Sequence, residues 1–127
     1  GFDDMIARAN LYREAGADVI FPEGLHDADE FARFMKASPG ATLANMTEFG
    51  KTKYLTEAEF RALGVAIVIY PLSLMRIAMK SVEDALVAFR RDGGFHGTLE
   101  EMQSRKELYE LLAYKPGDEW RFPANRA

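Results

Sequence analysis

The chain has 127 residues, of which 48% are hydrophobic, so it has the length of one domain and enough apolar side chains for a packed core. Its formal net charge is −4 with acidic and basic residues interleaved, and no basic stripe is present, so we expect neither a nucleic-acid nor a membrane partner. It contains no cysteine, which excludes disulfides, thiolate nucleophiles and Cys-based zinc sites in this chain and is compatible with a cytoplasmic location.

The first third of the chain predicts a helix, a strand and a second helix. Apolar residues recur at helical spacing over residues 5–12, after two acids that suit the positive end of a helix, and Gly16 supplies a stop. The run at residues 18–22 is β-branched and aromatic, which is typical of a buried strand. The second helix is closed by Pro39-Gly40. Its apolar face consists of Ala28, Phe31, Phe34 and Met35.

The middle of the chain predicts a strand, a helix and another strand. The stretch "TLANMTEFG", residues 42–50, begins as an apolar strand and ends in polar side chains. A capping box, Thr56 with Glu59, opens a helix that Gly64 ends. The third strand, "VAIVIYP" at residues 65–71, is apolar except for its Tyr hydroxyl. A strand that is apolar on both faces indicates a parallel sheet covered by helices.

The last part of the chain is predicted to be helical. A long helix is expected from about Ser73 to Arg91, with Gly93-Gly94 as the break after it. A second capping box, Thr98 with Glu101, predicts a helix that continues to about Ala113.

The alternation of helices and strands implies right-handed crossovers and a parallel sheet. Three strands make a poor independent α/β domain, so they indicate either the end of a doubly wound sheet or the last three units of a (β/α)8 barrel. We expect residues 1–127 to form part of one domain, with βα units over 1–92 and a terminal helix and tail over 98–127. The tail at 115–127 lacks periodicity and is expected to strap over a surface, anchored by Trp120.

Polar side chains follow the predicted strands at the point where each strand ends. Glu23 follows the first strand, while Asn45, Thr47 and Glu48 end the second. Arg76 lies one turn into the helix after the third. In either α/β architecture the carboxyl ends of the strands form the binding face, so we expect these groups on one rim. A cation in a first helical turn opposes the helix dipole by about 0.3–1 kcal/mol, so Arg76 suggests an anionic partner.

Each of these residues also has a simpler structural explanation. Glu23 suits a helix cap or a loop, and Asn45 and Thr47 suit hydrogen bonds to loop backbone. Arg105 projects into the apolar stripe of the last predicted helix, where it must snorkel, pair with an acid or reach an anionic ligand. Because arginine forks suit carboxylates and phosphates, the residues alone indicate a small anionic substrate.

Four segments carry a pattern that belongs to a known family: "GADVIFPEG", "LANMTEFGKT", "YPLSLMR" and "MQSRKELYELLAY". In this order and spacing, they resemble the C-terminal part of the 2-methylisocitrate lyase family, within the isocitrate lyase/phosphoenolpyruvate mutase superfamily. "NMTEFGKT" is the most specific piece, and the resemblance fades beyond Lys115. It implies a fragment of a (β/α)8 TIM barrel, about strands six to eight with the terminal helices.

The resemblance also implies a function for the longer protein. It would be a Mg²⁺-dependent lyase of propionate catabolism that cleaves 2-methylisocitrate to pyruvate and succinate by a retro-aldol-type scission. It would form a homotetramer in which a C-terminal helix is exchanged between subunits. The metal-binding acids and the catalytic Cys would lie upstream, so we expect no catalytic or metal-binding residue in this chain. The substrate-binding residues would be Glu23, Asn45, Met46, Thr47, Arg76 and Arg105.

Two alternatives stay open from the sequence. One is another superfamily member, acting on oxaloacetate, phosphonopyruvate or isocitrate. The other is a non-catalytic interaction module that associates through the open edge and exposed faces of a three-stranded sheet.

Overall fold

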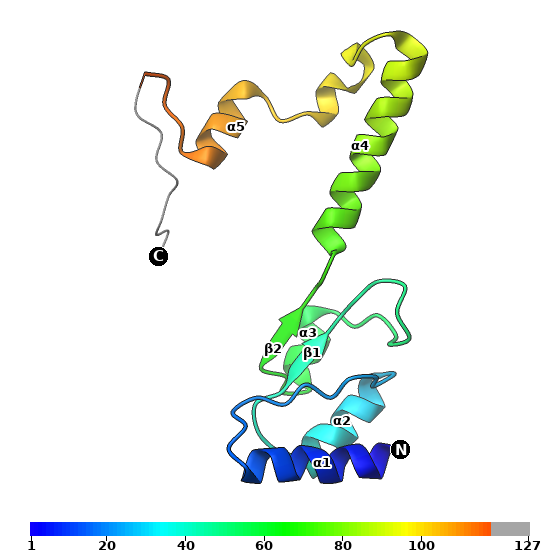
Figure 1. Ribbon diagram of the computed structural model, residues 1–127, viewed down its shortest axis with the longest axis vertical. Helices are drawn as coiled ribbons and strands as arrows, with labels where there is room; N and C mark the ends of the chain where they lie inside the picture. The colour runs from blue at the N-terminus through cyan, green and yellow to red at the C-terminus, as the bar shows by residue number, and fades with distance from the viewer. Residues whose placement is uncertain (118–127) are drawn as a thin grey trace. The chain divides into compact units, whose positions relative to one another are not determined.

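A computed structural model describes residues 1–117 (Figure 1). The chain divides into two compact units, Gly1–Ala78 and Met79–Ala127. Most of the tail at 115–127, which is predicted to lie across a surface, is outside the described residues, as is its predicted anchor Trp120. The assignment of the chain to one domain stays a prediction. Within residues 1–117, no helix has both the length and the apolar character that a membrane crossing requires.

The first unit contains three parallel segments with β1 in the centre. Strand β1 (Leu43–Asn45) pairs in parallel with β2 (Ile67–Ile69), so that Asn45 lies opposite Ile69. Figure 1 shows the two strands side by side and pointing the same way. The third segment is reduced to one parallel bridge, between Ile20 and Thr42. The predicted parallel topology is therefore confirmed for these three segments.

The predicted strand at residues 18–22 is wrong in its length, because only Ile20 pairs. Ile20 donates its N–H to the Ala41 carbonyl and accepts from the Leu43 N–H. The next donor in a parallel ladder would come from Pro22, which has no N–H, so the ladder ends there.

The three predicted helices of the first unit are confirmed. They are α1 (Phe2–Glu14), α2 (Ala28–Ala37) and α3 (Glu57–Ala62). Helix α3 begins with the predicted capping box, in which Thr56 and Glu59 exchange side-chain-to-backbone hydrogen bonds. Gly64 follows it with φ +80°, a conformation that favours glycine.

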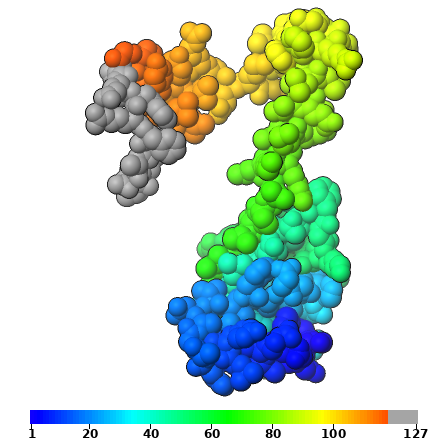
Figure 2. All heavy atoms as spheres, viewed as in Figure 1, coloured from blue at the N-terminus to red at the C-terminus, as the bar shows by residue number. Residues whose placement is uncertain are grey.

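One face of the parallel segments packs against these helices and forms the core of the first unit. Figure 2 shows the first unit as a body of blue to green atoms. The rings of Phe31 and Phe60 meet edge to face at 5.3 Å between centroids. The buried apolar residues are Ala9, Ile20, Leu25, Phe31, Phe34, Ala44, Met46, Leu55 and Phe60.

The opposite face of the same segments is apolar but open. Val19 and Phe21 are 39% and 45% exposed, and Ile67 and Ile69 are 42% and 40% exposed. The prediction that β2 is covered on both faces is therefore not met by the described residues, which cover one face only.

Arg13 fixes the end of α1 to the start of β1. Its Nη2 donates to the Ala41 carbonyl at 3.1 Å and to Thr42 Oγ1 at 3.3 Å, while its Nε donates to Ser38 Oγ at 3.2 Å. Ser38 and Thr42 are fully buried, so these bonds satisfy polar groups that water does not reach.

Helix α4 (Ser73–Asp92) confirms the predicted long helix and begins in the first unit. It buries none of its residues against the described part of the chain. Gly93 follows it with φ +72°, as the predicted break requires.

The predicted capping box at Thr98 is wrong. Residues His96–Glu101 form a 3-10 helix, in which Thr98 Oγ1 donates to the Phe95 carbonyl instead of capping an α-helix. The α-helix begins later, as α5 (Arg105–Leu112), with a complete capping box between Ser104 and Glu107. Both Thr-x-x-Glu and Ser-x-x-Glu fit the pattern, and the structure uses the second.

Candidate functional site at the strand ends

Register places two of the predicted site residues level with each other. Ile20 and Thr42 form the bridge, and Glu23 and Asn45 each lie three residues further along their parallel segments. Asn45 in turn lies opposite Ile69, at the end of β2. The structure therefore brings Glu23, Asn45 and the end of β2 to the same carboxyl edge, as the sequence predicts.

Asn45 has an unusual polar environment. Among the described residues, its Oδ1 is the one buried side-chain oxygen or nitrogen that has no hydrogen-bond partner. Ala44 beside it is buried in the core, so Asn45 lies on the other, open face of β1. A buried polar atom without a partner is costly, which makes Asn45 a candidate ligand contact.

Met46 faces the core instead of the rim. Its side chain is 1% exposed, and its sulfur accepts the Leu55 N–H at 3.2 Å. Its backbone N–H donates to the Ile69 carbonyl at 2.8 Å, which extends the pairing of β1 with β2. The side chain is thus committed to packing, and a role of Met46 in binding is limited to its backbone.

The end of β1 is joined to the first turn of α4 by a polar cluster. Ser73 Oγ donates to Glu48 Oε1 at 2.7 Å and is 2.9 Å from Oε2. Arg76 Nη1 donates to the Glu48 backbone carbonyl at 2.9 Å and lies 3.8 Å from the carboxylate Oε2. The anionic partner that the position of Arg76 suggested is therefore, in this structure, a residue of the chain itself.

This cluster has clear electrostatic consequences. The hydrogen bond from Ser73 is the main cause that lowers the pKa of Glu48, and the charge of Arg76 lowers it further. The Arg76 guanidinium also lies 5.5 Å from the centroid of the Phe49 ring, within the range of a cation–π contact. Phe49 is 96% exposed and has φ +65°, so its ring stands out from the surface in a strained backbone position.

Two further polar groups lie in the same region. Thr47 is half-buried, and its hydroxyl makes one long hydrogen bond, 3.5 Å, to the Glu48 carbonyl. Tyr70 follows β2, and burial raises the pKa of its hydroxyl, with smaller contributions from nearby groups such as Tyr54. Thr47 therefore lies at the edge that carries Asn45, whereas Tyr70 lines a pocket with Glu57 and Arg61 of α3.

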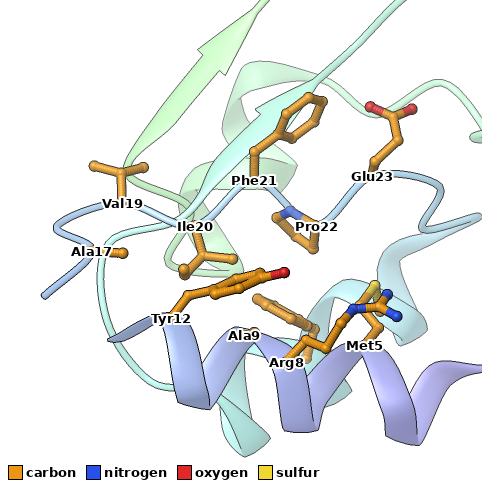
Figure 3. A pocket seen from close by; sticks show the side chains of 11 residues that line it. Met5, Arg8, Ala9, Tyr12, Ala17, Val19, Ile20, Phe21, Pro22 and Glu23 are labelled. Carbon is orange, nitrogen blue, oxygen red and sulfur yellow. The ribbon is translucent and has the colours of Figure 1, made fainter. Parts of the chain in front are cut away.

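Glu23 is exposed at the edge of a pocket of about 440 Å³ between α1 and residues 17–23 (Figure 3). Figure 3 shows Ile20 and Pro22 pointing toward α1, whereas Phe21 and the Glu23 carboxylate point to the other side. The Glu23 carboxylate thus projects from the open face of the segment, away from the core.

Arg105 lies in the second unit, as the first residue of α5, and it is exposed. Its expected place within an apolar stripe is wrong, because that stripe assumed one continuous helix from Thr98 to Ala113. Its predicted convergence with Arg76 on one ligand stays a prediction.

Sequence reasoning placed Glu48 on the rim without a role and did not single out Ser73. The only available signal was a hydroxyl at the predicted start of a helix, one turn before Arg76. Its partner lies 25 residues earlier in the chain, a distance that no local pattern spans.

Within residues 1–117 no group of three or more His, Asp or Glu side chains could hold a metal ion.

These features define a class of protein: a parallel α/β segment whose strand ends carry an amide, carboxylates and an arginine. The family model described as phosphoenolpyruvate phosphomutase matches residues 1–90, and the chain belongs to this family.

The chain is similar to curated 2-methylisocitrate lyases, as the sequence resemblance predicted. It is 48% identical over 116 residues to the probable 2-methylisocitrate lyase 1 of Corynebacterium glutamicum, which covers 91% of this chain and 38% of that protein. It is 45% identical over 114 residues to the 2-methylisocitrate lyase of Bacillus subtilis, which covers 90% of this chain and 38% of that protein. The chain thus spans about two fifths of the length of these relatives.

Solved structures of the superfamily share the fold. A crystal structure of 2,3-dimethylmalate lyase matches with a TM-score of 0.75 and 27% identity, over 86% of this chain and 38% of that one. Phosphonopyruvate hydrolase matches with a TM-score of 0.72 and 34% identity, over 89% of this chain and 41% of that one. Members of this superfamily are TIM barrels, and the present chain corresponds to a short α/β part of one.

Proposed function

We propose that this chain is the C-terminal part of a 2-methylisocitrate lyase and supplies side chains that bind the substrate carboxylates. The similarity to curated lyases of that name supports the choice of substrate. The observation that carries a binding role is the buried, unpartnered Asn45 Oδ1, at the edge where Glu23 is level with it.

In the proposed reaction, the bond that breaks joins the hydroxyl-bearing carbon of 2-methylisocitrate to the adjacent carbon that becomes part of succinate. The hydroxyl loses its proton and becomes the carbonyl of pyruvate, while the electron pair stays on the other fragment, which takes up a proton to give succinate. Three carboxylates must be held during this cleavage. Arg76 suits one of them because its guanidinium presents several donors in a fixed fork. Among the described residues, only its Nη1 donates a hydrogen bond.

The other predicted site residues have matching roles. The Asn45 Nδ2 group and the Thr47 hydroxyl can donate to carboxylate oxygens. The substrate hydroxyl can donate to Asn45 Oδ1 or to the Glu23 carboxylate, which are both acceptors. Met46 contributes through its backbone, since its side chain is buried. Arg105 completes the set as a second cation, contributed by the terminal helix.

A magnesium ion belongs to this proposal but not to the described residues. A phosphonopyruvate hydrolase of the superfamily has been crystallised with oxalate and Mg²⁺. Within residues 1–117 no three His, Asp or Glu side chains form a group that could hold a metal ion. Its ligands and the general acid are proposed to come from the remaining three fifths of the longer enzyme, a cytoplasmic homotetramer with an exchanged terminal helix.

The test is turnover by the full-length protein. We expect cleavage of 2-methylisocitrate to pyruvate and succinate with a higher kcat/KM than for isocitrate, oxaloacetate or phosphonopyruvate, each measured with Mg²⁺ present. Turnover of oxaloacetate or phosphonopyruvate without cleavage of 2-methylisocitrate would instead assign the protein to another branch of the superfamily.

A matched pair of variants tests the role of Arg76. Arg76→Lys removes the planar fork, so KM for 2-methylisocitrate should rise by about tenfold or more. Arg61→Lys is the control, because Arg61 lies on α3 and pairs only with Glu57 in the described contacts. Its KM should stay within about twofold of the wild type. Equal effects of the two substitutions would contradict the proposed site.

A further inference from the structure

The cluster at the end of β1 contains more contacts than an ordinary surface ion pair. Glu48 reaches Ser73 with its carboxylate and Arg76 with its backbone carbonyl, at 2.7 and 2.9 Å. The next residue, Phe49, places its ring beneath the same guanidinium. All four residues belong to the first unit, so their mutual placement is defined.

The guanidinium of Arg76 is held at one of its nitrogens and is open at the others. Nη1 is held by the carbonyl and lies near the carboxylate, whereas Nη2 and Nε donate no hydrogen bond to any of the described residues. The side chains of Arg76 and Glu48 are 41% and 30% exposed, so the group is accessible to a solute. An arginine fixed on one side can present its remaining donors without losing further side-chain freedom on binding.

Ser73 makes this arrangement specific. A carboxylate with no other partner would turn freely to face Arg76 as a simple pair, which at a surface contributes little. Here the Ser73 hydroxyl is within hydrogen-bond distance of both carboxylate oxygens, at 2.7 and 2.9 Å. The carboxylate is therefore anchored to the start of α4, one turn before Arg76, where the positive end of the helix dipole also favours it.

We infer that Glu48, anchored by Ser73, is a positioning residue that fixes the Arg76 guanidinium for an incoming carboxylate. This inference rests on the proposed function for the identity of that carboxylate. Glu48 does not itself contact the substrate. Its role is distinct from those of Glu23, Asn45, Met46, Thr47 and Arg105, because it acts only through Arg76.

The first measurement uses steady-state kinetics of the full-length enzyme on 2-methylisocitrate. Glu48→Gln should raise KM by about tenfold and change kcat by less than about threefold, because a misplaced guanidinium weakens binding before it alters chemistry. Glu48→Asp should recover part of the loss. Asp4→Asn is the control, since it removes the exposed Asp4–Arg8 pair of α1 and should leave KM within about twofold.

The pH dependence separates positioning from a merely structural contact. Ser73→Ala removes the hydrogen bond that lowers the pKa of Glu48, so this carboxylate becomes protonated at a higher pH than in the wild type. The increase in KM on acidification should therefore begin at a higher pH in Ser73→Ala. An unchanged acid limb would contradict the inference.

The second measurement does not depend on the substrate. The rate at which phenylglyoxal modifies Arg76, followed by peptide mass spectrometry, should rise by about threefold or more in Glu48→Gln, because the guanidinium is less constrained. The rate at Arg61 should not change. If the wild type fails to cleave 2-methylisocitrate, the proposed function fails while this rate still tests the inference. An unchanged Arg76 rate, or a lowered KM that shows Glu48 competing with the ligand, would overturn it.

Discussion

At the scale of single residues, two buried polar groups show opposite situations. Thr42 is fully buried, donates to the Gly40 carbonyl and accepts from Arg13, so its hydroxyl is satisfied. Asn45, three residues later, has a buried Oδ1 without a partner. Because only satisfied polar groups support the folded state, we interpret Thr42 as structural and Asn45 as a residue kept for binding.

This contrast predicts different effects on stability. Thr42→Val removes the hydroxyl that accepts from Arg13 Nη2 and donates to the Gly40 carbonyl. The loss of these two buried hydrogen bonds should lower the melting temperature by about 2–8 °C, a loss on the order of 1–2 kcal/mol. Asn45→Leu removes an unpaired oxygen at similar volume and should leave the melting temperature unchanged or raise it, while it weakens substrate binding. Thermal unfolding of the full-length protein measures both. A larger loss for Asn45→Leu than for Thr42→Val would contradict this interpretation.

At the scale of secondary structure elements, local patterns predicted most helices well. The Thr56–Glu59 capping box, the stop at Gly64 and the long helix at residue 73 are all found, because caps and glycine stops act within one turn. Two features escaped prediction for a physical reason. The strand at 18–22 lost its ladder to the missing N–H of Pro22, and two competing capping patterns at Thr98 and Ser104 could not be ranked without tertiary contacts.

The observed capping box of α5 can be tested directly. Ser104→Ala should destabilise the start of α5 by about 1 kcal/mol, whereas Ser104→Asp should preserve the cap. Amide hydrogen exchange at Glu107 and Leu108 reports the change. Thr98→Ala should leave these two amides unaffected, since Thr98 bonds to the Phe95 carbonyl. Loss of protection in Thr98→Ala alone would restore the earlier assignment.

The same cap should depend on pH. Hydrogen bonds to Ser104 lower the pKa of Glu107 below its ordinary value of 4.5. A group whose pKa is lower in the folded state stabilises that state above its unfolded pKa and loses this effect as the pH falls through the folded pKa. Protection of the first turn of α5 should therefore be constant above about pH 5 and decrease below 4.5. A decrease that begins at neutral pH would contradict the assignment to Glu107.

At the scale of the whole molecule, the predicted site is only partly defined by this chain. The strand-end residues and Arg76 belong to the first unit, and Arg105 belongs to the second. Sequence patterns identified the rim because parallel strands share a carboxyl edge, but they could not locate partners such as Glu48 and Ser73 across 25 residues. The open face with Val19, Phe21, Ile67 and Ile69 has apolar character that is typical of a buried surface.

This open face predicts how the isolated chain behaves. A 127-residue chain produced alone should bind the dye ANS and form larger species in light scattering, since contiguous apolar surface favours association. The full-length protein should bind several times less dye per chain, because we expect the rest of the proposed barrel to cover this face. A stable, dye-free monomer of the isolated chain would instead favour an independent interaction module.

The bridge between Ile20 and Thr42 also fixes the register of the two segments that it joins. Because Glu23 and Asn45 are counted from the same pair, deleting one residue between Ile20 and Glu23 would move that carboxylate by about 3.3 Å and turn it to the helix-covered side. Natural relatives should therefore vary in length elsewhere, in the turns before Ile20 or after Phe49, and keep these two counts fixed.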